Sequence, residues 1–124
     1  MTNLLFKEES YRIIGLCMEV HRTLGRGFDE VVYKDALQYE FSQVGIAFER
    51  EHRFDIKYKE VILNHPYYAD FVVFGEIILE AKAVQALTQA HVKQTINYLA
   101  ASGLKLGLLV NFGEDSLTYK RIVL

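Results

Sequence analysis

Two acids and a lysine interrupt an otherwise apolar stretch near the middle of the chain: Asp70, Glu80 and Lys82. The stretch, residues 68–82, is typical of two strands joined by a tight turn. Because side chains alternate between the two faces of a strand, Glu80 and Lys82 point the same way. Whether Asp70 joins them depends on how the two strands are aligned.

The length of the turn decides this alignment. A two-residue turn at 75–76 would leave Asp70 on the face opposite Glu80. A three-residue connection at 74–76 pairs Asp70 with Glu80 and brings all three charges to one face. We expect the three-residue connection, because such loops need a left-handed residue and Gly75 can supply one without strain.

Two carboxylates and an ammonium in one place suggest a metal site. Like charges about 4 Å apart repel by roughly 4 kcal/mol at the effective dielectric of a protein surface. A divalent cation such as Mg²⁺ or Mn²⁺ removes that cost, and it binds one or two carboxylates together with water and phosphate oxygens. The Ala81 carbonyl could add a third protein oxygen, and Lys82 could steady the attacking water or the phosphate. The alternative is a simple salt bridge between Lys82 and one of the acids.

The bulk composition limits the class of protein. A length of 124 residues, 51% hydrophobic and 24% charged, predicts one domain, residues 1–124, with a core of its own. The net charge of −2 gives no general attraction to nucleic acid, so binding would need local basic residues. The candidates are Arg50, Arg53, Lys57, Lys93 and Lys105. One cysteine, no apolar run long enough to span a membrane and no signal-peptide pattern predict a cytoplasmic protein without a membrane partner.

The rest of the sequence predicts the elements that position these residues. The expected order is helix, helix, three-stranded meander, helix, strand, strand. Because a strand that follows a crossover helix is added parallel, we expect an α/β fold with a mixed central sheet flanked by helices. The expected elements are helices near 5–24, 28–44 and 87–102, a half-buried edge strand near 47–59, the hairpin at 68–82, and strands at 104–113 and 116–124.

Several polar residues on the predicted helices are further candidates. Glu30 lies on the apolar stripe of the second helix, where it is either a site-facing carboxylate or a favourable partner of the helix dipole. His91, Gln94 and Tyr98 share one face of the third helix, which either supports the site or is an ordinary solvated face. His21 lies on the apolar stripe of the first helix, as a satisfied core histidine or as a residue near the site.

These residues resemble the PD-(D/E)XK nuclease superfamily, whose core is a restriction-endonuclease-like αβββαβ unit. Asp70 followed by Glu80-Ala81-Lys82 matches its defining pattern, and residues 94–98 resemble the Q-x-x-x-Y helix motif of its RecB-like branch. Residues 27–33 match the signature of the GxxExxY family within that superfamily. The flanking stretches 20–25 and 103–113 are also similar to that family, so the resemblance covers nearly the whole chain.

The resemblance implies a metal-dependent nuclease that acts on nucleic acid, with DNA expected ahead of RNA. Asp70 and Glu80 would hold Mg²⁺ or Mn²⁺, and Lys82 would assist the nucleophile. Gln94 and Tyr98 would support the site, and Glu30 would lie close to it.

One departure bears on the substrate. Members of the family commonly have a basic residue two positions before the metal-binding aspartate, whereas this chain has Tyr68. The alternative to a nuclease is a binding or interaction module that keeps the fold but has little activity of its own. Such a module would work as a homodimer or in a larger complex through its edge strand.

Overall fold

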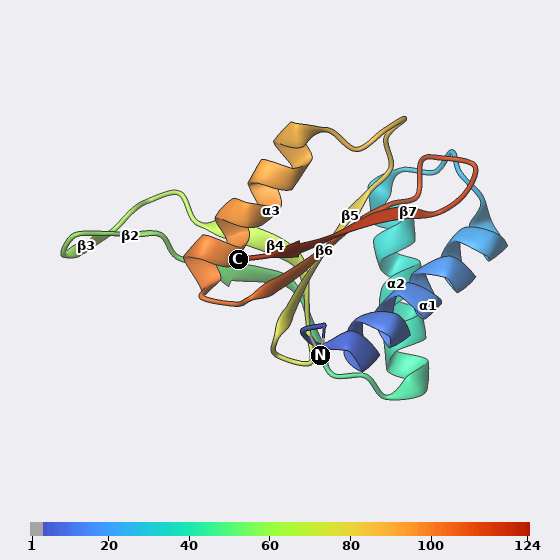
Figure 1. Cartoon of the computed structure of the whole chain (residues 1–124), viewed down its shortest axis with the longest axis horizontal. Coiled ribbons are helices and arrows are strands. Elements are labelled where there is room, and N and C mark those ends of the chain that lie inside the picture. Colours follow the sequence, from blue (N-terminus) through green and yellow to red (C-terminus); the bar gives the residue numbers. More distant parts are fainter. Residues whose placement is uncertain (1–3) are drawn as a thin grey trace.

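The chain folds around a five-stranded mixed sheet with helices on both faces (Figure 1), as seen in a computed structural model that describes residues 4–124. The strand order is β1-β4-β5-β6-β7, in which only β5 and β6 are parallel. This confirms the predicted α/β fold with a mixed sheet. The elements are α1 (Lys7–Leu24), α2 (Glu30–Val44), β1 (Phe48–Phe54), β2 (Lys57–Tyr58), β3 (Val61–Ile62), β4 (Tyr67–Val73), β5 (Ile77–Lys82), α3 (Gln89–Ser102), β6 (Leu106–Asn111) and β7 (Thr118–Val123).

The central hairpin of β4 and β5 has the predicted three-residue connection. Phe71 pairs with Leu79, so continuing the register places Asp70 opposite Glu80. Gly75 is left-handed with φ of 68°, as predicted. Phe74 is left-handed as well, with φ of 59°, which the sequence did not predict.

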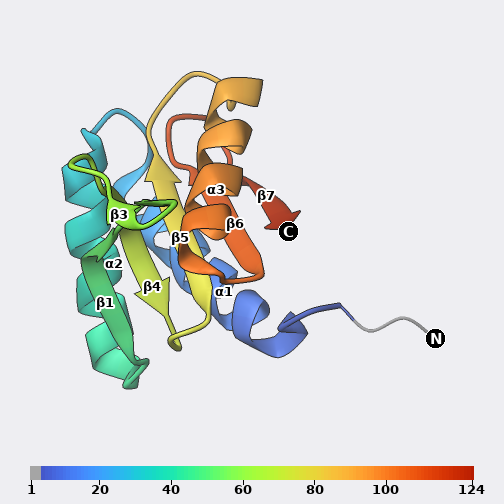
Figure 2. The same cartoon turned by 90° about the vertical axis from the view of Figure 1, so that its left-hand side faces the viewer.

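Each face of the sheet is covered by a different layer of helices. In Figure 2, α1 and α2 lie behind the sheet and α3 lies in front of it. Along β5, Ile77, Leu79 and Ala81 pack into the core beneath α1 and α2, whereas Ile78 packs beneath α3. Because side chains alternate, Glu80 and Lys82 lie on the α3 side. The fold therefore places the predicted acid and lysine on the face that α3 covers.

The connection between α1 and α2 is fixed by a buried tyrosine. The Tyr33 hydroxyl donates to the Gly25 carbonyl at 2.6 Å, and the Tyr33 ring stacks on Phe112 with 4.6 Å between ring centroids. Nearby, His21 is buried and its Nε2 lies 2.8 Å from the Glu114 carbonyl oxygen. His21 is thus a satisfied core histidine rather than a residue of the acidic site.

The strand predicted near 47–59 is interrupted. β1 ends at Phe54 and the chain pairs again only in the short hairpin of β2 and β3, which projects from the sheet in Figure 1. We call residues 57–63 the arm. None of the helices in the described range, 4–124, is long and apolar enough to cross a membrane.

Candidate metal and nuclease site

The carboxylates of Asp70 and Glu80 converge between β4 and β5. The backbone N–H of Asp70 donates to Glu80 Oε2 at 2.7 Å, and the backbone N–H of Ala81 donates to Asp70 Oδ2 at 2.8 Å. Each side chain thus accepts a backbone hydrogen bond from the neighbouring strand. This reciprocal pair fixes both carboxylates where the ladder of backbone hydrogen bonds ends.

Glu80 is buried in an environment that disfavours its charge. Its exposed fraction is 2%, and burial together with the charge of Asp70 raises the pKa of Glu80 to about 8. The Asp70 backbone hydrogen bond and the ammonium groups of Lys82 and Lys34 act in the opposite direction but do not offset the burial. Two acids held this close are therefore short of positive charge.

Lys34 of α2 supplies part of that charge, which the sequence did not predict. Its ammonium lies 3.2 Å from Asp70 Oδ1 and 2.5 Å from Glu51 Oε1. Burial alone would lower the pKa of Lys34, but its bonds to Glu51 and Asp70 raise the pKa above its ordinary value. Lys34 lies four residues after Glu30, on the same face of α2, and that spacing was the available signal.

Glu51 meets Lys34 because β1 is irregular at this point. The ladder between β1 and β4 pairs Arg50 with Phe71 and His52 with Ala69, but it omits the pair between them. Glu51 has φ of 53°, in the left-handed region. The break therefore falls opposite Asp70, where the strands part around the acidic site.

The segment after Lys82 is held by a buried asparagine. Asn111 Nδ2 donates to the Val84 carbonyl at 2.9 Å, and Asn111 Oδ1 accepts from the N–H groups of Val84 and Gly113 at 3.0 Å each. A Cβ on Gly113 would lie 2.2 Å from the Val84 carbonyl oxygen, so only glycine fits there. Asn111 and Gly113 thus set the path of the chain just beyond Glu80 and Lys82.

Helix α3 brings one of its predicted residues to the site. Tyr98 is buried, and burial followed by the charges of Glu80 and Asp70 raises its pKa to about 12. Gln94 lies one turn earlier on the same face and is exposed. His91 caps the start of α3, where its Nδ1 accepts from the Thr88 N–H at 3.0 Å. Of the polar face predicted on α3, the structure thus brings Tyr98 to the acids.

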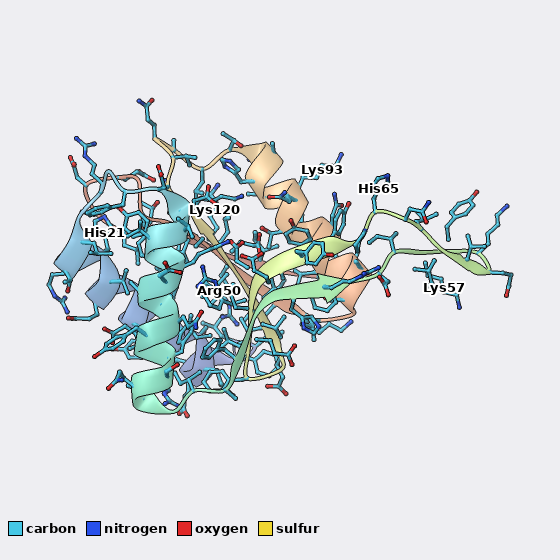
Figure 3. The ribbon with its side chains drawn as sticks, turned by 180° about the vertical axis from the view of Figure 1, so that it is seen from behind. His21, Arg50, Lys57, His65, Lys93 and Lys120 are labelled. Carbon is cyan, nitrogen blue, oxygen red and sulfur yellow. The ribbon has the colours of Figure 1, made fainter. Side chains whose placement is uncertain are left out.

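The predicted basic residues do not form one patch. Arg50 bonds to Asp35 and Gln38, and Arg53 bonds to Asp55. The three remaining candidates are lysines on separate segments: Lys57 on the arm, Lys93 on α3 and Lys105 just before β6. Figure 3 shows Lys57 on the projecting hairpin, His65 on the connection that follows it, and Lys93 on α3.

The donor set fits a hard divalent cation. One oxygen of each carboxylate is held by a backbone N–H, and the second oxygen of Asp70 already faces a positive charge on Lys34. Within residues 4–124, no three acidic, histidine or cysteine side chains converge on one point, so the site offers two carboxylates. Mg²⁺ and Mn²⁺ need no more, since water and phosphate oxygens complete their shell. The Ala81 carbonyl is the candidate third protein ligand.

The sequence matches the family model of the PD-(D/E)XK nuclease superfamily over residues 7–122, so this chain belongs to that superfamily. Enzymes of the superfamily act on nucleic acid and generally use divalent metals. No curated protein is similar enough in sequence to count as a match.

Two solved structures share the fold, which is restriction-endonuclease-like. The crystal structure of SSO0001 superposes with a TM-score of 0.61 over 95% of this chain, at 17% identity. An alkaline exonuclease from Laribacter hongkongensis superposes with a TM-score of 0.52 over 99% of this chain, at 15% identity. The chain spans 59% of the first structure and 72% of the second.

Proposed function

We propose that this chain is a divalent-metal-dependent nuclease that hydrolyses phosphodiester bonds of DNA at the site of Asp70, Glu80 and Lys82. The observation that carries the proposal is the convergence of the two carboxylates, through reciprocal backbone hydrogen bonds, in a chain of the PD-(D/E)XK superfamily. The likeness to an alkaline exonuclease supports a nuclease. We further assign the chain to the GxxExxY family of the RecB-like branch, as one domain over residues 1–124.

Each residue of the proposed site has a separate task. Asp70, Glu80 and the Ala81 carbonyl would hold Mg²⁺ or Mn²⁺, which when bound neutralises charge on the phosphate and lowers the pKa of the attacking water. Lys82 lies close enough to Glu80 to favour its ionised form, and it would place its ammonium against the phosphate oxygens.

Residues of the two flanking helices would complete the site. Tyr98, whose hydroxyl stays protonated at neutral pH, would donate a hydrogen bond to the substrate or to a carboxylate. Gln94 would contact the substrate from the exposed end of the same face of α3. Glu30 lies one turn before Lys34 on α2, and it would orient water near the metal.

The proposal is tested by comparing the cleavage of nucleic acid by wild type and by single-residue variants. Wild type, Asp70→Asn and Glu76→Gln are incubated with plasmid DNA, linear duplex and RNA in Mn²⁺, with and without chelator. Glu76 is an exposed acid in the connection next to the same hairpin, so its variant is the matched control. We expect cleavage by wild type and Glu76→Gln, and none by Asp70→Asn or in chelator, with unchanged circular dichroism.

Two outcomes would contradict the proposal. Cleavage that persists in pure Asp70→Asn protein would exclude this site. A wild-type protein that cleaves none of the substrates and binds no Mn²⁺ would favour an interaction module, in which case a homodimer or a larger complex becomes the function to test.

A further inference from the structure

The arm exposes apolar side chains that the rest of the molecule does not cover. Tyr58, Val61 and Ile62 are exposed to 56%, 54% and 54%, and Leu63 to 40%. The arm contains only two paired positions, Tyr58 with Val61 and Lys57 with Ile62. A hairpin this short is marginal in water by itself, and clustered exposed apolar side chains mark a binding surface. The arm is therefore a candidate binding surface.

Its charge favours nucleic acid as that occupant. The arm carries Lys57 and Lys59 against Glu60, a net charge of +1 in a chain whose net charge is −2. The Lys59 ammonium lies 5.4 Å from the centre of the Tyr58 ring. An aromatic ring beside lysines is the combination that binds unpaired bases and their phosphates.

A second copy of the chain fits less well. The four apolar side chains are already about half covered, and together they offer on the order of 400 Å². A stable interface buries about 800 Å² on each partner. The arm alone is too small for a dimer.

The arm is also continuous with the proposed site. Ile62, which pairs with Lys57 in the arm, lies eight positions before Asp70 on the path from β3 into β4. That path spans at most about 26 Å, which is roughly eight nucleotides at the 3.4 Å rise of one strand. In Figure 3, Lys57 lies on the projecting arm, away from the helices.

We propose that the arm binds a single-stranded DNA segment up to roughly eight nucleotides from the cleavage point, with Tyr58 stacked on a base and Lys57 and Lys59 on phosphates. The proposal rests on the proposed nuclease function, but its test does not require cleavage. The binding of labelled oligothymidine is measured by fluorescence anisotropy in chelator, in the Asp70→Asn background. Long strands of about twenty nucleotides are used, because they exceed the largest possible separation of the arm from Asp70.

Each arm variant has its own expected result. Tyr58→Ala should weaken the binding of long strands about tenfold, whereas Tyr58→Phe, which keeps the ring, should stay within about twofold. The double variant Lys57→Ala/Lys59→Ala should reduce the slope of log affinity against log salt by about 1.4, since each phosphate contact to a single strand contributes about 0.7. Lys7→Ala, an exposed lysine at the start of α1 on the other face of the sheet, should change neither quantity.

Several results would overturn the assignment. These are wild-type affinity for long strands in Tyr58→Ala, an unchanged salt slope in the lysine pair, or an equal loss in Lys7→Ala. A wild-type dimer in sedimentation that Tyr58→Ala dissociates would assign the arm to a second copy instead. The lysine variants keep Tyr58 and its pair with Val61, so their salt slope decides the matter even if Tyr58→Ala disturbs the hairpin.

Discussion

Replacing Glu80 by glutamine should make the stability of the metal-free protein less dependent on pH. Burial first and Asp70 second raise the pKa of Glu80 from 4.5 to about 8. Between these values the folded protein holds a proton on Glu80 that the unfolded chain has lost. The free energy of unfolding of the wild type therefore falls as pH rises through this window, and it levels off above the upper value.

The magnitude follows from the size of the window. Each pH unit costs about 1.4 kcal/mol, so the full window corresponds to at most about 5 kcal/mol. Because Glu80 is almost fully buried, solvent screens its charge little. Glutamine keeps an oxygen that can accept the Asp70 N–H but carries no charge, so the variant should lack this part of the pH dependence.

The measurement is urea unfolding followed by circular dichroism, in chelator, from about pH 5 to about pH 9. The difference between wild type and Glu80→Gln isolates the buried acid, because the other groups titrate in both proteins. Glu76→Gln, which alters an exposed acid, should follow the wild-type curve. Parallel curves for wild type and Glu80→Gln would refute the view that burial disfavours the ionised form of Glu80 in the folded protein. Mn²⁺ should restore stability at high pH in the wild type only.

Two further substitutions test how the site is held. Lys34→Met removes the ammonium between Asp70 and Glu51, so the metal-free protein should lose about 1–3 kcal/mol of unfolding free energy in urea. Calorimetry should show tighter Mn²⁺ binding by the same variant. If neither the stability nor the Mn²⁺ affinity changes, Lys34 is not the counter-ion of Asp70. Gly113→Ala forces a methyl group against the Val84 carbonyl and should lower the free energy of unfolding by about 1–3 kcal/mol. The control, Gly15→Ala, lies in open space on α1 and should raise it by about 1 kcal/mol. Equal effects of the two substitutions would contradict the close approach at Gly113.

Local rules were enough to predict the hairpin that carries the acids. Glycine at position 75 and strict alternation fix the three-residue connection, and these place Asp70 opposite Glu80. Three residues of the apolar stripe predicted on α2 are likewise buried, Tyr33, Leu37 and Phe41, whereas Val44 at its end is exposed. The sequence is sufficient to predict a local structure that depends on one turn residue and one periodic pattern.

The rest depends on contacts between distant segments. Lys34 contacts both Asp70 and Glu51, and Glu51 lies where β1 breaks its ladder. Glu51 is a non-glycine residue in a left-handed conformation, which alternation cannot reveal. The alternating pattern continues beyond Phe54, yet the sheet ends there because β4 begins only at Tyr67, after Pro66. No local pattern indicates how far a partner strand extends.

The most direct test of the two-carboxylate site is the anomalous signal of manganese in a crystal grown with Mn²⁺. We expect a peak between Asp70 and Glu80, within ligand distance of the Ala81 carbonyl, and no such peak in Asp70→Asn crystals. Manganese bound elsewhere on the chain, or cleavage by a protein whose two acids remain free of metal, would contradict the proposed site.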